Sequence, residues 1–235
     1  MSAPTSSPTG PKAQLLTIRS KSLSARILLR SPDPIDAYSL TARGRDPICT
    51  QYLPHLQRMR DKITVESNTR QVRKWRRDSG IVGFFLCVVL LGEHAEHLRG
   101  VDQSQNANTT IGDTGLMPLD LEAKRSELGI MLNSTPDIRG KGYAVEALNM
   151  QFAYGFDHLG LEEMFFGTAE DNEPMRKLLE KKFGLEPQWK EATKDYSYTA
   201  TKKWWDERQA AAGENRIVVE GELTDLKDEE KEQDS

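Results

Sequence analysis

The chain has 235 residues and a net charge of −4 at pH 7, and it is long enough to bury one good core. Its most apolar stretch, from Ile81 to Gly92, is shorter than the roughly 20 residues of a membrane-spanning helix, and the N-terminus lacks the hydrophobic core of a signal peptide. The sequence therefore argues against a membrane partner and against export, and predicts a cytoplasmic protein, with a nuclear location left open. Its two cysteines, Cys49 and Cys87, form no CxxC pair, which favours reduced thiols.

Composition divides the chain into three parts. The N-terminal segment, residues 1–19, begins with a run rich in Pro, Ser and Thr, and we expect it to be disordered. Nine acidic and three basic residues fall between 214 and 235, so we also expect the tail over residues 209–235 to be mostly disordered. Within this tail, only "RIVVEGEL" has the pattern of a strand. One folded domain is predicted over residues 20–208.

Between these ends, strand patterns alternate with helix patterns. The predicted strands cover residues 25–32, 84–92, 109–119, 127–132, 164–169 and 196–205. The predicted helices cover residues 33–44, 64–80 and 144–159, with a short one after Asn172. The polar stretch 93–108 is expected to be a flexible hairpin tip. This order predicts an α/β protein with a mixed sheet flanked by helices.

The segment "DIRGKGYAVEAL", residues 137–148, places two glycines and two cations in front of a helix. Gly140 and Gly142 allow backbone conformations closed to other residues and leave no side chain in the way of a ligand. The first N–H groups of a helix lack internal partners and carry the positive end of the helix dipole. Together with Arg139 and Lys141, this turn is suited to hold a phosphate group.

Two common phosphate motifs do not fit this turn. A mononucleotide P-loop needs Lys and then Ser or Thr after its last glycine, whereas Tyr143 follows Gly142. A dinucleotide fingerprint needs a third glycine where this chain has Val145. The glycines by themselves fit a tight turn between a strand and a helix equally well.

A family resemblance favours the phosphate interpretation. Arg139, Gly142 and Ala144 match the pattern Arg-x-x-Gly-x-Ala, which resembles the acyl-CoA pyrophosphate loop of the GNAT superfamily of N-acetyltransferases. The segment from Met164 to Pro187 continues in the family's order of strand, asparagine and short helix. Its residue pattern most resembles that of the branch that includes ribosomal-protein alanine acetyltransferases. The resemblance covers Ser126 to Pro187, extends more weakly back to residue 25, and is absent from both tails.

The resemblance implies a fold and a co-substrate. It implies the GNAT fold, with a central mixed, mostly antiparallel, twisted sheet of six to seven strands flanked by helices. It also implies acetyl-CoA as co-substrate, with no metal. By the family's pattern, the pyrophosphate binds the loop and the pantetheine arm binds the backbone of the preceding strand and a side chain beyond it. The residues of this chain at those positions are Arg139, Gly140, Lys141, Gly142, Tyr143 and Ala144 for the loop, Ile130, Met131 and Leu132 for the strand, and Asn172 for the side chain.

Glu127 is the first candidate for the proton acceptor, because it opens the strand that carries the cofactor and corresponds to a glutamate often used in this way in related enzymes. An aliphatic ammonium has a pKa of about 10, so a carboxylate must remove a proton as the amine enters a drier site. An ordinary glutamate at a strand end is the competing interpretation. Asp113, on the neighbouring predicted strand, is the reserve candidate.

The acid that would protonate the departing thiolate is harder to find. Where the family often has Ser or Tyr on the short helix, this chain has Met175, which has no proton to donate. Tyr196 and Tyr198, on the last predicted strand, have hydroxyl groups that can serve, and Tyr198 is our candidate. Tyrosines in a strand more often serve packing. Asn172 has the alternative interpretation of a helix-entry residue ahead of Pro174.

Two further patterns receive simpler interpretations. His94 and His97 have metal-binding spacing on a helix, but no third ligand lies nearby in the sequence. The segment from Arg58 to Arg77 has eight cations and two acids, which raises the possibility of a nucleic-acid or ribosome-binding module. Because Trp75 is its only aromatic residue, a solvated helix face is favoured over binding to nucleic acid.

The sequence thus predicts an acetyl-CoA-dependent N-acetyltransferase that transfers acetyl directly to a primary amine in a ternary complex. The acceptor is either a protein N-terminus or a small-molecule amine. The alternatives are an acyl-CoA-binding regulatory protein with little or no turnover, and an RNA- or ribosome-associated binding module. The oligomeric state is left open.

Overall fold

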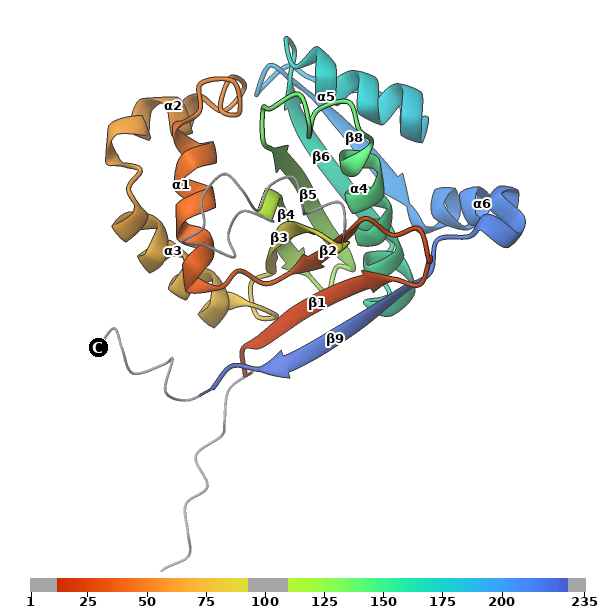
Figure 1. The fold of residues 1–235 in the computed structure, drawn as a ribbon. Coiled ribbons are helices and arrows are strands. Elements are labelled where there is room, and N and C mark those ends of the chain that lie inside the picture. Colours follow the sequence, from red (N-terminus) through yellow and green to blue (C-terminus); the bar gives the residue numbers. More distant parts are fainter. Residues whose placement is uncertain (1–11, 93–109, 228–235) are drawn as a thin grey trace, which may run out of the picture.

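The computed structural model describes residues 12–92 and 110–227 (Figure 1). Within these ranges nine strands form one sheet, in the order β7-β8-β6-β5-β4-β3-β2-β1-β9. Neighbouring strands are antiparallel except for β5 and β6, which are parallel. The predicted α/β class with a mixed, mostly antiparallel sheet is confirmed, although the sheet has more strands than the six to seven expected. The predicted hairpin tip at 93–108, including His94 and His97, lies outside the described residues.

The strands are β1 (Gln14–Ser20), β2 (Ile27–Arg30), β3 (Phe84–Leu90), β4 (Thr110–Asp120), β5 (Arg125–Leu132), β6 (Glu163–Ala169), β7 (Gln188–Lys190), β8 (Asp195–Thr201) and β9 (Val219–Asp225). The α-helices are α1 (Ala37–Arg45), α2 (Pro54–Met59), α3 (Val65–Asp78), α4 (Tyr143–Ala153), α5 (Glu173–Lys177) and α6 (Lys202–Ala212). Two π-helical turns, Tyr154–His158 and Leu178–Phe183, continue α4 and α5. Among the described helices, none has the length and apolar character needed to cross a membrane.

The sheet is the middle layer of the molecule, with α1 and α3 on one side and α4 on the other (Figure 1). Adjacent residues of a strand point to opposite faces, and β3 shows this directly. The Phe84 ring meets Tyr154, just beyond α4, edge to face with centroids 6.3 Å apart. The next residue, Phe85, stacks on Trp75 of α3 with centroids 3.6 Å apart. We refer to these two sides as the α4 face and the α1 face.

The tryptophans expected on the closing strand lie instead on a helix. β8 ends at Thr201, whose hydroxyl accepts the Trp204 N–H at 3.2 Å and caps α6. Trp204 and Trp205 then pack in the aromatic cluster around Phe152 of α4, with centroids 5.1 and 6.0 Å away. The chain therefore leaves the sheet at Thr201, which caps the helix three residues before the first of the two adjacent tryptophans.

The first and last described strands, β1 and β9, pair in the sheet, beyond both expected domain boundaries. β1 begins at Gln14, inside the segment expected to be disordered, and β9 lies within the acidic tail. They pair antiparallel over seven positions, from Gln14↔Asp225 to Ser20↔Val219. Residues 12–19 and 209–227 therefore belong to the folded unit, because each strand supplies the hydrogen-bonding partner that the other lacks alone. Residues 1–11 and 228–235 lie outside the described ranges.

Gly221→Ala tests whether β9 is part of the fold. A Cβ atom at Gly221 would lie 2.2 Å from Cε2 of Tyr154, which is buried and held against Phe84. We expect the substitution to lower the free energy of unfolding by about 1–3 kcal/mol, as overpacking does elsewhere. Urea denaturation measures this, with the exposed neighbour Glu222→Ala as the control. Equal stability of both variants would contradict the packing of β9 on Tyr154.

Candidate active site

The candidate site is a gap between β5 and β6. The two strands pair in parallel at only three positions, Arg125↔Glu163, Ser126↔Met164 and Glu127↔Phe165. Beyond this point β5 continues to Leu132 on β4, and β6 continues to Ala169 on β8. The strands therefore part, and the edge of β5 that faces β6 is not paired with it beyond Glu127.

The register shows which backbone groups face this gap. The Asn133 N–H, just after β5, donates to the Ile111 carbonyl of β4 at 2.8 Å. Along a strand the backbone groups of successive residues point to opposite edges, so Met131 also directs its groups to β4. Ile130 and Leu132 direct theirs toward the gap. Of the three residues expected to bind a pantetheine arm through the backbone, two are thus oriented for it.

The predicted phosphate loop adjoins the gap and has the backbone form that its glycines allow. Gly140 and Gly142 have φ values of +74° and +85°, in the left-handed region. Gly142 also begins α4: its carbonyl accepts the Glu146 N–H at 3.1 Å, the first bond of the helix. The N–H groups of Tyr143, Ala144 and Val145 come before that bond and have no helical acceptor. Arg139 and Lys141 are exposed beside them.

Two residues not found from the sequence hold this loop in place. Arg26, just before β2, donates from Nε to Glu146 Oε2 at 2.9 Å and from Nη1 to the Lys141 carbonyl at 2.8 Å. Its guanidinium carbon lies 4.6 Å from the centre of the Tyr143 ring. The sequence contains a signal for this pair, because Glu146 places a negative charge in the first turn of a helix expected to bind phosphate. A carboxylate there repels phosphate, so we expect a neighbouring cation to compensate its charge.

Glu127 lies where β5 and β6 begin to part, on the α1 face. Two residues further along this face is Gly129, which is exposed and where a Cβ atom would have no neighbour within 4 Å. Partial burial raises the pKa of the Glu127 carboxyl, and the negative charge of Asp195 on β8 raises it further. A half-buried carboxylate with a raised pKa beside open space has the properties of a general base.

Asp113 lies apart from Glu127 and has a cation of its own. It pairs across the strands with Met131, four residues from Glu127, which is about 13 Å along the strand. Its carboxylate accepts from Arg43 Nε of α1 at 2.8 Å, and Arg43 also donates to Asn133 Oδ1 at 3.1 Å. Burial raises the pKa of Asp113, while the Arg43 charge opposes the rise. Through these contacts Asp113 joins α1 to the sheet.

Tyr198 and Glu127 lie on opposite faces of the sheet. Phe165 pairs with Glu127 on one side and Thr199 on the other, so Tyr198, next to Thr199, points to the α4 face. Its buried hydroxyl donates to Glu180 Oε1 at 2.7 Å. Burial, followed by the hydrogen bond to Glu180, raises the pKa of Tyr198 to about 12. The structure therefore does not bring the predicted acid and base together.

Asn172 begins α5. Its side-chain oxygen accepts the Met175 N–H at 3.3 Å, which is the helix-entry role weighed for it. This cap uses the amide oxygen and leaves the NH2 group suited to donate to a pantetheine arm. Met175 itself packs against the hydrophobic core.

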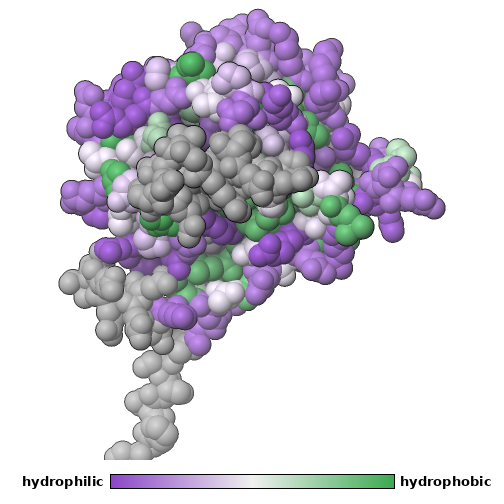
Figure 2. Space-filling model, viewed as in Figure 1, coloured by the Kyte–Doolittle hydropathy of each residue, from purple (hydrophilic) through white to green (hydrophobic). Residues whose placement is uncertain are grey.

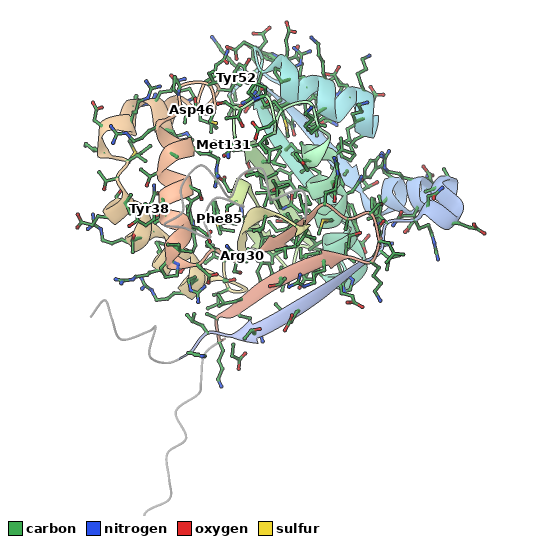
Figure 3. The ribbon with its side chains drawn as sticks, in the orientation of Figure 1. Arg30, Tyr38, Asp46, Tyr52, Phe85 and Met131 are labelled. Carbon is green, nitrogen blue, oxygen red and sulfur yellow. The ribbon has the colours of Figure 1, made fainter. Side chains whose placement is uncertain are left out.

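The end of α1 and the segment after it approach the same end of β5. Figure 3 shows Met131 between this segment, marked by Asp46 and Tyr52, and the strands that carry Phe85 and Arg30. The Ser134 hydroxyl donates to Asp46, and the Cys49 thiol donates to the Leu132 carbonyl at 3.4 Å. The hydrogen bond from Ser134 lowers the pKa of Asp46. The α1 side thus forms a wall beside the gap.

The cationic helix face lies on this wall. α3 buries Val72, and its exposed Arg70 pairs with Glu66 at 2.6 Å.

On the side seen in Figure 2, hydrophobic residues outside the grey atoms occur in small groups among hydrophilic ones. In residues 12–92 and 110–227, no group of three or more His, Cys, Asp or Glu side chains is placed to hold a metal ion.

Comparison with known proteins agrees with this geometry. Residues 26–185 match the family model described as "Acetyltransferase (GNAT) domain". The "N-acetyltransferase 9-like protein" of Caenorhabditis briggsae is 27% identical over 130 residues, covering 53% of this chain and 59% of that protein. This chain thus matches less than two thirds of that relative's length.

Solved structures show the same fold at low sequence identity. Mycobacterium smegmatis RimJ, in complex with CoA-disulfide, is 16% identical with a TM-score of 0.58, covering 85% of this chain and 94% of that one. The microcin C7 self-immunity acetyltransferase MccE, in complex with acetyl-CoA and AMP, is 13% identical with a TM-score of 0.58, covering 76% and 93%.

Asp113→Ala separates a structural role from a catalytic one. The substitution leaves the buried Arg43 guanidinium without its carboxylate, so we expect the free energy of unfolding to fall by about 3–5 kcal/mol. Chemical denaturation measures the loss, and the double variant Arg43→Ala/Asp113→Ala should be less destabilised than the sum of the two single variants. A stable Asp113→Ala protein without activity would instead make Asp113 catalytic.

Proposed function

The chain belongs to the acetyltransferase (GNAT) family, and from this premise we propose that it transfers the acetyl group of acetyl-CoA to a primary amine. The observation that carries the proposal is the parting of β5 and β6 beside the N-terminus of α4. In this arrangement the unpaired backbone groups of β5 are suited to bind an extended thioester arm. The first N–H groups of α4, beside the gap, are suited to bind a diphosphate.

In the proposed complex each part of acetyl-CoA has its own partners. The backbone groups of Ile130 and Leu132 bind the pantetheine amides, and Asn172 adds a side-chain contact. The N–H groups at the start of α4 bind the diphosphate, with charge from Arg139 and Lys141. Backbone N–H groups in the gap also polarise the thioester carbonyl and stabilise the oxyanion that forms on it.

The chemical step is a direct transfer within a ternary complex. Glu127 accepts a proton from the acceptor's ammonium, directly or through water, and so frees the nitrogen lone pair. The nitrogen forms a bond to the thioester carbon, the nitrogen of this tetrahedral adduct gives its second proton to water, and the carbon–sulfur bond then breaks. The thiolate of CoA takes a proton from water, because Met175 has none to give and the Tyr198 hydroxyl is engaged with Glu180. Positioning of the two substrates supplies much of the rate enhancement.

The acceptor approaches from the α1 face, where Glu127 and the open surface over Gly129 lie. A protein N-terminus and a small-molecule amine both present the required ammonium. The fold shared with RimJ, together with the sequence from Met164 to Pro187, favours a place in the branch that includes ribosomal-protein alanine acetyltransferases. We therefore propose a protein N-terminus as the first acceptor to test.

A second candidate function is an acyl-CoA-binding protein with little or no turnover. It is favoured by one specific observation, which is that Met175 occupies the position of the family's usual acid while Tyr198 lies on the opposite face from Glu127. Both candidates require the acetyl-CoA site, and only the first requires Glu127 to be ionised during turnover.

Gly142→Glu tests the acetyl-CoA site. The substitution places a carboxylate at the start of α4, where the diphosphate is proposed to bind, so we expect binding to weaken by about 100-fold or more. Calorimetric titration with acetyl-CoA measures this. The matched control is Gly184→Glu, which adds the same charge at another left-handed glycine, with φ of +67° and no neighbour within 4 Å of an added Cβ atom. Tight binding by Gly142→Glu would contradict the proposed site.

The pH profile of acetyl transfer tests Glu127. Because the base must be ionised, kcat/KM should be lost as the pH falls through the raised pKa of Glu127. Asp195→Asn removes the nearby negative charge, which lowers the pKa of Glu127, so the acid limb should move to lower pH. Thiol release, measured with a panel of peptides and small amines, gives the profile.

Glu127→Gln should retain acetyl-CoA binding and lose at least about 100-fold in kcat. Asp171→Asn, at an exposed position, is the control for Asp195→Asn and should leave the profile unchanged. An acid limb that does not move in Asp195→Asn, or a fully active Glu127→Gln, would assign the base elsewhere. No thiol release by the wild type with any amine would favour the second candidate function.

A further inference from the structure

Arg26 joins three segments that are far apart in the sequence. Its backbone is fixed by the sheet, since its carbonyl accepts the Leu91 N–H at 2.8 Å next to the β2–β3 pairing. Its side chain reaches the first turn of α4 and the phosphate loop. A residue held in the sheet thus contacts both parts of the proposed diphosphate site.

The contacts with Glu146 fix the guanidinium in one orientation. Nε and Nη2 of Arg26 both lie 2.9 Å from Glu146 Oε2, and the Arg26 backbone N–H donates to Glu146 Oε1 at 2.8 Å. Charge-assisted bonds of this kind hold a planar guanidinium more firmly than a single contact does. Both side chains are less than one-third exposed, at 31% and 19%, so water screens the pair only in part.

From this orientation the guanidinium reaches the loop. Nη1 donates to the Lys141 carbonyl at 2.8 Å, which fixes the peptide that leads into Gly142. Nη2 lies 3.5 Å from the position that a Cβ atom on Gly142 would take. The guanidinium also covers the Tyr143 ring, at the first position of α4. Arg26 therefore contacts residues on both sides of the left-handed glycine that begins the helix.

The charge of Glu146 gives these contacts a consequence for binding. A carboxylate in the first turn stabilises a helix, but it also repels a diphosphate at the same N-terminus. Arg26 compensates this charge while its hydrogen bonds keep the carboxylate turned toward β2. The helix N-terminus then keeps its positive end available to an anion.

We infer that Arg26 is a positioning residue for the diphosphate of acetyl-CoA, acting through Glu146 and the Lys141 carbonyl. It sets the form of the loop over residues 139–142 and cancels a negative charge that would oppose the phosphates. Its effect is confined to the nucleotide half of the co-substrate and does not extend to the thioester. This inference rests on the proposed function, because it requires acetyl-CoA to bind at α4.

The test compares two ligands on the full-length protein. Acetyl-CoA has the diphosphate, whereas S-acetylpantetheine has the thioester and the arm without it. Calorimetric titration of Arg26→Ala should show binding of acetyl-CoA weakened by about tenfold or more, with binding of S-acetylpantetheine within about twofold of the wild type. Arg19→Ala, which removes an exposed arginine from β1, is the matched control and should change neither affinity.

A second comparison isolates the charge of Glu146. In the Arg26→Ala background, Glu146→Gln removes the uncompensated carboxylate, so the double variant should bind acetyl-CoA more tightly than Arg26→Ala alone. If Arg26→Ala does not fold, Arg26→Lys replaces it. The lysine keeps the charge but lacks the planar guanidinium that bonds Glu146 and the Lys141 carbonyl in one fixed geometry, so an intermediate loss is expected.

Three results would overturn the inference. They are wild-type affinity of the Arg26 variant for acetyl-CoA, equal losses for both ligands in a folded variant, and a double variant that binds no better than the single one. Failure of the proposed function gives a different result, since the wild type would then not bind acetyl-CoA at all.

Discussion

The end of parallel pairing between β5 and β6 is the constraint on which the rest of the site depends. Three residue pairs hold the strands together, and beyond Glu127 each strand follows its other neighbour. Backbone groups inside a protein need hydrogen-bonding partners, so an edge opened in the middle of a sheet is suited to a ligand with amide groups of its own. Glu127 stands at the point of parting, and α4 begins beside the opening.

The elements on the two sides of the gap have different roles in the proposed site. On the α4 side, left-handed glycines precede a helix whose first N–H groups have no helical acceptor, and Arg26 holds that helix start against β2. On the α1 side, the ion pair of Arg43 with Asp113 fastens α1 to the sheet, and Glu127 faces open surface. In this account, one side of the sheet anchors the co-substrate and the other receives the amine.

The sequence predicted well those features that adjacent residues encode. The loop glycines, the helix that follows and the strands on either side are encoded in adjacent residues, and the family and its fold followed from them. Contacts between distant residues were not predictable in this way. Arg26 and Glu146 are 120 positions apart, and Arg43 and Asp113 are 70 apart, so no spacing rule joins them. β1 was missed for the same reason, while its partner β9 was foreshadowed only by the strand pattern of "RIVVEGEL" within a tail expected to be mostly disordered.

The most direct test of the central claim is amide hydrogen exchange, resolved by residue, with and without acetyl-CoA. Ligand binding in the gap should slow exchange at Ile130, Leu132 and the first turn of α4, because these N–H groups would gain acceptors. The Met131 N–H, directed at β4, should change little. Protection confined to other parts of the sheet, with Ile130 and Leu132 unaffected, would contradict the assignment of the gap as the acetyl-CoA site.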